Sequence, residues 1–318
     1  MRAPPRRAFP TIFLREELSL FKNLIVYRIA AGWSVSAAQM QESLEKARFV
    51  GCGATQPVSV GWVEPRGVAH APLAEVVAGQ VLLKLVTEQK VLPGAVVRRR
   101  VDEMAAKIEQ TTGRKPGKKQ KKELKEEALL ELLPQAFTKQ AAINVWLDAE
   151  HMLLLVDASS PARADEVVSL LVKSFEGLSI SHVATVESPA VAMTRWLATG
   201  EPPQAFTVDR ECELKSADEM KSVVRYARHP LDTEEVRRYV AEGKLPTKLA
   251  LTWQGRVSFM LTDTMQIKKV AFLDGVFEGS KPGKDEAFDA DAAIATGELR
   301  HLIPDLVDAL GGEQPLPA

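Results

Sequence analysis

Two short motifs in this chain have the residue types of metal-dependent chemistry. Glu123-Leu124-Lys125 and Glu213-Leu214-Lys215 each match the Glu-x-Lys half of a nuclease pattern in which carboxylates hold a metal ion. The Pro-Asp half of that pattern is missing upstream of both. Because Glu-x-Lys also arises from ordinary surface charge on a helix, we favour a structural role. A metal-dependent nuclease that uses Glu123 or Glu213 stays as an alternative.

Other catalytic arrangements are absent from the sequence. The segment 113–118 resembles a phosphate-binding glycine loop, but it is one residue short, lacks the Ser or Thr that would hold the metal, and follows a helical pattern. The five histidines form no HxH, HExxH or triad-like group. Cys52 and Cys212 lie far apart, without zinc-ligand spacing. We therefore predict no enzymatic activity, no cofactor and no metal.

A strongly basic segment runs from Arg98 to Lys125. It holds eleven lysines and arginines against four acids, in a chain whose net charge is −1. Crowding like charges costs free energy, so the segment indicates a polyanionic partner, with nucleic acid the first candidate. No acid interrupts positions 118 to 122, whereas a solubilising surface normally mixes both signs. We assign contacts with the DNA backbone to Arg98, Arg99, Arg100, Arg114, Lys115, Lys118, Lys119, Lys121 and Lys122.

Two other interpretations of the basic segment stay open. It could be the solvated face that keeps a helical pair soluble, or the surface of a protein adaptor that binds an acidic partner. Clustered lysines contact phosphate charge without reading base edges, so DNA binding should be independent of sequence. Aromatic residues are scarce near the segment, which argues against a stacking platform for single strands. Double-stranded DNA is the expected partner.

The elements that carry these cations are predicted to form a helical hairpin. Apolar residues recur every three or four positions from 96 to 110, the glycines and proline of 113–117 break the pattern, and a second helical pattern covers 118–133. Strands are expected at 21–29, 81–86, 143–148, 152–157, 249–253, 257–261 and 267–272. Helices are expected at 36–47, with a Ser36–Gln39 capping box, at 166–175, at 232–243 with a cap at Asp232, and at 299–310. The fold class is α+β, with antiparallel sheets and packed helices.

The length and composition fit a globular protein of about two domains. The chain has 318 residues, of which 46% are hydrophobic, enough for a sizeable core. Charge is polarised along the chain, since residues 271–318 hold ten acids and three bases. No apolar run approaches the ~18 residues of a membrane span, and the basic start lacks the apolar stretch of a secretory signal. We expect a cytoplasmic protein that does not bind membranes.

The order of short motifs along the chain resembles one family, the bacterial recombination-associated protein RdgC. The resemblance spans about residues 20 to 312 and is carried by Phe21-Lys22-Asn23-Leu24, Gly61-Trp62-Val63, Lys90-Val91-Leu92-Pro93, Lys122-Glu123-Leu124-Lys125-Glu126-Glu127, Leu132-Leu133-Pro134-Gln135-Ala136-Phe137, residues 247–253, Phe288-Asp289-Ala290-Asp291 and Thr296-Gly297-Glu298-Leu299. It implies a ring-shaped homodimer that encircles duplex DNA without sequence preference, opposes RecA filaments and associates with the nucleoid.

The resemblance also implies a domain plan. A centre domain would comprise 20–91 plus 131–185, a helical tip 92–130 would be inserted in it, and a base would cover 186–312. Subunits would meet tip to tip and base to base. The family begins near Phe21, so residues 1–19 look like a disordered, dispensable extension, and 313–318 would be a C-terminal tail.

Three residues outside the basic segment, Phe137, Arg228 and His229, take their expected roles from this resemblance. Phe137 matches a phenylalanine that closes the tip interface by entering a pocket on the partner; otherwise it would be an ordinary core aromatic. Arg228 and His229 stand where relatives carry Lys-Gln near the base interface and the hole. The arginine keeps the charge, whereas His229 and the following Pro230 depart from the pattern. Lys248, within the 247–253 motif, completes the expected DNA contacts.

Overall fold

The computed structural model describes residues 20–276 and 287–314. The proposed extension, 1–19, and residues 315–318 of the proposed tail lie outside these ranges. The described part is an α+β fold built on one large antiparallel sheet, which confirms the predicted class. Its strands follow the order β2-β4-β5-β6-β1-β12-β11-β10-β8-β9, with β3 on β4 and β7 on β1. We expected separate sheets, but their two halves are joined where β1 pairs with β12.

The elements alternate irregularly along the described chain. The strands are β1 (Asn23–Ile29), β2 (Val58–Val63), β3 (Glu75–Val77), β4 (Gln80–Val91), β5 (Phe137–Asp148), β6 (Leu153–Asp157), β7 (Ile180–His182), β8 (Phe206–Ser216), β9 (Val223–Ala227), β10 (Lys244–Trp253), β11 (Val257–Thr262) and β12 (Ile267–Phe272). The helices are α1 (Ala37–Glu45), α2 (Gly94–Thr112), α3 (Lys118–Leu132), α4 (Pro161–Ser174), α5 (Pro189–Thr199), α6 (Glu234–Ala241) and α7 (Ala287–Ala309), with short 3₁₀ turns at Leu133–Gln135 and Asp274–Val276.

The half of the sheet around β1 is buried on both faces. Leu24 and Val26 of β1 belong to the core that contains α5, α6 and α7, whereas Ile25 and Tyr27 belong to the core under α1 and α4. Successive strand residues point to opposite faces, so a strand covered on both sides must be apolar throughout. This accounts for the unbroken run Leu153–Val156 in β6, which is buried along its whole length.

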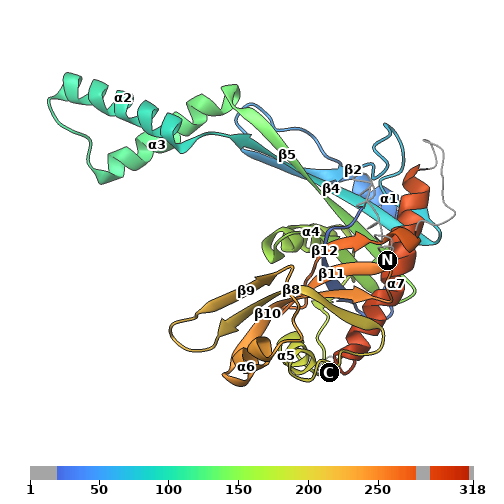
Figure 1. Cartoon of the computed structure of the whole chain (residues 1–318). Coiled ribbons are helices and arrows are strands. Elements are labelled where there is room, and N and C mark those ends of the chain that lie inside the picture. Colours follow the sequence, from blue (N-terminus) through green and yellow to red (C-terminus); the bar gives the residue numbers. More distant parts are fainter. Residues whose placement is uncertain (1–19, 277–286, 315–318) are drawn as a thin grey trace, which may run out of the picture.

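The helical hairpin stands at the far end of the long strands β4 and β5, where β2 flanks β4 as far as Gln89. The strands β4 and β5 pair continuously from Val81–Leu147 to Val91–Phe137, and α2 and α3 extend beyond that far end, away from the rest of the molecule (Figure 1). Gly113, at a φ of 71°, ends α2 in the left-handed conformation that glycine adopts without steric cost. The predicted hairpin is therefore present, and the strand predicted at 81–86 continues to Val91.

Several predicted boundaries were right and others were wrong. The Ser36–Gln39 capping box is confirmed. The cap predicted at Asp232 is instead Thr233, whose hydroxyl accepts a hydrogen bond from the Val236 amide. The last helix begins well before residue 299, and α5, β8 and β9 were not predicted. Among the described residues, no helix is both long and apolar enough to span a membrane.

The C-terminal end of the described chain is tied to the body. Arg28 in β1 pairs with the Glu313 carboxylate, and the Gln314 amide donates to the carbonyl of Ala184 at 2.8 Å. Residues 313 and 314, which we assigned to a tail, thus join the centre half of the sheet to the end of the chain.

Candidate nucleic-acid interface

Four lysines at the start of α3 form an exposed cationic surface. Lys118, Lys119, Lys121 and Lys122 are all solvent-exposed, and no ion pair or side-chain hydrogen bond engages their ammonium groups among the described residues. A helix N-terminus carries a partial positive charge and favours acids, and like charges four residues apart, as at Lys118 and Lys122, repel. This arrangement therefore costs helix stability. We call these residues the lysine cluster.

The other predicted cations of the hairpin differ in whether a carboxylate pairs with them. Arg100 donates to both carboxylate oxygens of Glu131, at 2.9 and 2.8 Å, and contacts Glu103 at 3.1 Å. The hydrogen bond to Glu131 is the main reason why the pKa of Arg100 lies above its usual value. This arginine ties α2 to α3 and is poorly placed for a phosphate. Arg99 and Lys115 are exposed with only long contacts to acids, at 3.8 and 3.9 Å, and Arg98 and Arg114 are exposed as well.

An apolar groove with a basic rim lies between α2 and α3. It encloses about 510 Å³, its floor includes Leu92, Val101 and Leu129, and its rim carries Arg98 and Lys121. A second groove of about 420 Å³ continues from it toward the sheet and shares Leu92 and Leu129. Grooves lined by aliphatic side chains favour an apolar side chain from a partner.

Phe137 stands exposed beside this second groove. Its side chain is 88% exposed, although a phenylalanine of this size is normally buried. It opens β5 opposite Val91, and Val91 lines the groove and is itself exposed. The alternative that Phe137 is a core aromatic is therefore wrong for the single chain. An exposed aromatic next to an apolar groove is the pattern of an interface anchor.

Arg228 and His229 lie in the base half of the sheet, directly after β9. Arg228 is exposed and has a φ of 56°. The His229 backbone amide donates to the Arg210 carbonyl at 3.1 Å, and its ring packs on Tyr226 with the ring centroids 5.4 Å apart. The β8–β9 hairpin and the α2–α3 hairpin project from the same side of the molecule (Figure 1). The predicted site residues therefore form two groups, one on the α2–α3 hairpin and the adjoining start of β5, the other in the base half of the sheet.

Lys248 is engaged by an acid. Its ammonium group lies 3.1 Å from both oxygens of Glu213, which also accepts from Arg225 at 2.6 Å and from Thr247 at 2.8 Å. Arg225 is the first of the partners that together lower the pKa of Glu213 to about 2. Glu213 therefore holds Lys248 in place, and because the same carboxylate also pairs with Arg225, the three charged groups together keep a net charge of +1.

The two Glu-x-Lys motifs are not brought together. Glu123 is exposed on α3, whereas Glu213 is on β8 in the base half, and these elements are well separated (Figure 1). Within residues 20–276 and 287–314, no group of three or more His, Cys, Asp or Glu side chains is arranged to hold a metal ion. The carboxylate of Glu213 is instead part of a network with Arg225, Thr247 and Lys248.

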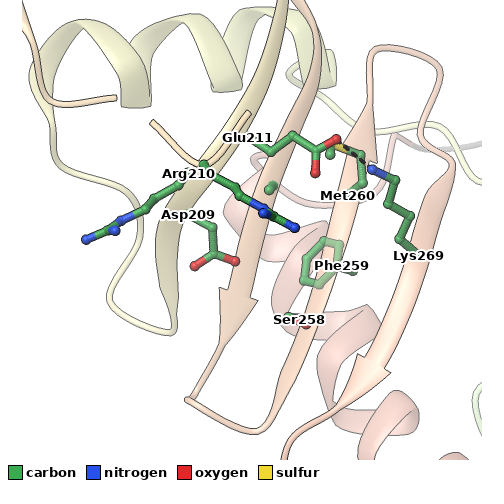
Figure 2. Close-up of a pocket in the computed structure, with 9 residues that line it drawn as sticks. Asp209, Arg210, Glu211, Ser258, Phe259, Met260 and Lys269 are labelled. Atoms are coloured by element: carbon green, nitrogen blue, oxygen red, sulfur yellow. Dashed lines mark hydrogen bonds and ion pairs between the residues drawn. The ribbon is translucent and has the colours of Figure 1, made fainter. Parts of the chain in front are cut away.

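Sequence reasoning missed two cations that the fold places near Arg228. Arg210 of β8 and Lys269 of β12 line the same cavity of the base sheet as Arg228, and Figure 2 shows Lys269 reaching toward Glu211 across this cavity. In the sequence, Asp209-Arg210-Glu211 alternates in charge like an ordinary exposed strand. No local signal distinguishes Arg210, because only the order β8-β10-β11-β12 in the sheet brings it to the same cavity as Lys269.

Comparisons with known proteins agree with the sequence resemblance. Residues 20–313 match a family model described as "Putative exonuclease, RdgC". The chain is 45% identical over 299 residues to the "Recombination-associated protein RdgC" of Dechloromonas aromatica, with 92% of this chain and 98% of that protein covered. The protein of the same name from Cupriavidus necator is 46% identical over 297 residues (92% and 99% covered), and the one from Bordetella pertussis is 41% identical over 297 residues (92% and 99% covered).

Proposed function

The chain belongs to the RdgC family of recombination-associated proteins, and we propose that it binds duplex DNA without sequence preference, as a ring-shaped homodimer that encircles the duplex. In this function it limits the access of RecA to DNA and is associated with the nucleoid. The lysine cluster carries the proposal. It is exposed and unpaired in the described structure, and its position at a helix N-terminus is unfavourable unless an anion is bound.

Electrostatics favour backbone contact over base reading. Lysine ammonium groups are flexible point charges that suit phosphates, whereas base recognition needs bidentate side chains held in a groove. Positions 118–122 hold four lysines and no acid, and Arg98, Arg99, Arg114 and Lys115 add exposed charge on the same hairpin. The affinity should therefore come from displaced counterions and be similar for every sequence.

The two projections support a closed dimer. In this proposal the α2–α3 tip, 92–130, and the base, 186–312, meet their equivalents in a second subunit, and the centre domain, 20–91 plus 131–185, joins them. The exposed Phe137 of each subunit enters the apolar groove around Val91, Leu129 and Leu133 of the other. A twofold axis makes such a contact self-complementary, because each subunit offers both the aromatic side chain and the groove.

Occlusion is the simplest mechanism by which such a ring acts. A closed ring cannot leave a duplex merely by losing its phosphate contacts one at a time, so weak contacts give a long residence, much as linked modules do. The duplex inside the ring is then unavailable to a RecA filament. No chemical step on DNA is required of any residue in this mechanism.

The test of the proposal is binding to random-sequence duplexes as a function of salt. If about 6–10 phosphates are neutralised, affinity should fall on the order of 10³–10⁵-fold between roughly 50 and 200 mM salt. Fluorescence anisotropy with two unrelated 40-base-pair duplexes measures this directly. A flat salt response, or a strong preference for one duplex, would contradict the proposal.

The same preparation separates the rival functions. The family description names an exonuclease, so linear and closed circular plasmids should be incubated with Mg²⁺ or Mn²⁺ and inspected for degradation. Shortening of the linear plasmid that is lost in a Glu123→Gln or Glu213→Gln variant would establish the nuclease instead. A chain that binds no naked DNA but captures an acidic protein would establish the adaptor.

A further inference from the structure

The larger groove of the hairpin, which we call the α2–α3 groove, has an apolar floor that DNA binding does not explain. Its volume is about 510 Å³. Val97 and Val101 of α2 and Leu129 of α3 line the floor, together with Leu92 from the segment between β4 and α2. Residues four positions apart lie on the same face of a helix, so Val97 and Val101 project into the groove together. A duplex that is held through its phosphates leaves such a floor unfilled.

The walls of the α2–α3 groove carry three cations and one acid. Arg98 and Asp102 stand about one turn apart on α2, and Lys121 and Lys125 stand about one turn apart on α3. Among the described residues, no ion pair or side-chain hydrogen bond engages Lys121, Lys125 or Asp102. Arg98 donates its Nε–H to the Gly94 carbonyl at 3.3 Å and pairs with no carboxylate in the described part of the chain. Unpaired positive charge therefore surrounds an apolar surface.

An occupant of this groove must supply both apolar side chains and negative charge. The hairpin of a second copy does not fit, because the segment from Arg98 to Lys125 holds eleven lysines and arginines against four acids and would bring like charge to the rim. In the proposed dimer, Phe137 of a second copy enters the neighbouring groove at Val91 and Leu133. A duplex supplies the charge but no aliphatic side chain. A peptide segment that combines apolar residues with carboxylates supplies both.

We infer that the α2–α3 groove binds an acidic, apolar peptide segment of another protein. The apolar side chains of the segment pack on the floor, and its carboxylates pair with Arg98, Lys121 and Lys125 on the rim. This binding goes beyond the proposed function, and only its effect on DNA rests on that function. Because Arg98 and Lys121 are also assigned to the DNA backbone, the segment and a duplex exclude each other from these two cations. An acidic partner would thereby loosen the hold of the tip on DNA.

The probe for this inference is a short fluorescein-labelled peptide in which leucine and aspartate alternate. Fluorescence anisotropy measures its binding to the whole protein. Replacing the leucines of the peptide with serine should weaken binding about tenfold or more, because the apolar floor then has no partner. Replacing the aspartates with asparagine should weaken binding about fivefold or more, because the rim then has none. Changes in the peptide leave the fold of the protein untouched.

Two variants of the rim should change the affinity for this peptide in opposite directions. Lys125→Gln removes a cation that lines the groove but is not assigned to DNA, and should weaken peptide binding about two- to fivefold. Asp102→Asn removes the acid that lines the groove and should tighten peptide binding about twofold, a gain that a misfolded hairpin could not produce. Lys107→Gln is the matched control, because Lys107 is an exposed lysine of α2 that does not line the groove. The control should bind the peptide as the wild type does.

Competition with DNA is measured with a labelled random-sequence duplex and unlabelled peptide. A saturating concentration of the peptide should lower the affinity for the duplex at least about tenfold near 100 mM salt, because about two phosphate contacts are lost. Duplex affinity that stays constant as the groove fills would overturn the inferred exclusion at Arg98 and Lys121.

Other outcomes would overturn the peptide site itself. No binding of the alternating peptide up to about 1 mM would contradict it, as would equal binding of the serine version. Equal losses of peptide affinity in Lys125→Gln and Lys107→Gln would mean that only the overall charge of the hairpin attracts the peptide. Dissociation of dimers by the peptide, followed by analytical ultracentrifugation, would mean that a second copy fills the groove. A wild type that binds the peptide but no duplex would instead contradict the proposed function and leave the peptide site standing.

Discussion

Replacing all four residues of the lysine cluster, Lys118, Lys119, Lys121 and Lys122, with glutamate is expected to abolish most DNA affinity while leaving the fold intact. If each lysine neutralises one phosphate, the slope of log K against log salt should fall by about 3 to 4, and affinity near 100 mM salt by on the order of 10²-fold or more. Stability should change little, because acids suit the N-terminus of α3 better than lysines do, while glutamates at 118 and 122 repel each other as the lysines did and those at 119 and 122 face Glu123 and Glu126.

The control for this variant keeps the charge and changes only the side chain. Arginine at the same four positions should preserve the affinity and the salt slope within a few fold, since the proposed contacts depend on charge and not on base recognition. Anisotropy titrations at several salt concentrations and thermal melts measure both properties. If the glutamate variant binds as the wild type does, the lysine cluster is only a solvated surface.

Phe137→Ala is expected to weaken the dimer without unfolding the subunit. A phenylalanine in a core costs about 3–5 kcal/mol of unfolding free energy when cut to alanine, but Phe137 is 88% exposed, so its loss should change subunit stability by no more than about 0.5 kcal/mol. As an interface anchor it should be worth about 2 kcal/mol or more of association free energy, or roughly 30-fold or more in the dimer dissociation constant.

Analytical ultracentrifugation and urea unfolding separate these two effects. Val68→Ala is a suitable control, because this exposed aliphatic residue lies in the loop between β2 and β3 of the centre domain, outside both the tip and the base. A Phe137→Ala protein with unchanged dimer mass across the concentration range and unchanged retention of DNA would refute the proposed tip contact. A large loss of unfolding free energy would mean that Phe137 supports the subunit itself.

Local patterns in the sequence predicted the tip correctly. The helices α2 and α3 follow from heptad-like apolar spacing and from glycines and a proline that no helix interior accepts, so their existence depends on short-range chemistry. The unusual charge at positions 118–122 is likewise a local property. The lysine cluster could therefore be predicted from the sequence without knowledge of any tertiary contact.

The base half was predicted less well because its strands depend on long-range pairing. The strand β8 mixes buried Cys212 and Leu214 with the charged segment 209–211, and its bulge shifts the alternation that identifies a strand. The cavity around Arg210 needs β8, β11 and β12 together, which no short window contains. Similarly, only the structure reveals that Lys248 pairs with Glu213 and that Arg100 pairs with Glu131.

The family resemblance and the local physics contribute different parts of the site. Spacing and charge point to the lysine cluster by themselves, whereas Phe137 and Arg228 entered through the resemblance. The structure then gives each of these two a physical property that fits its proposed role: an exposed aromatic ring beside an apolar groove, and an unpaired guanidinium on a left-handed backbone.

Closure of the ring around DNA is tested most directly by the release of the protein from circular and linear DNA. The protein would be assembled at low salt on a closed circular plasmid and on the same plasmid cut once, then challenged with about 0.5 M salt, where phosphate contacts are weak. A closed ring should stay on the circle at least about tenfold longer than on the cut plasmid, from whose ends it slides off. Equal release from the two plasmids would contradict encirclement.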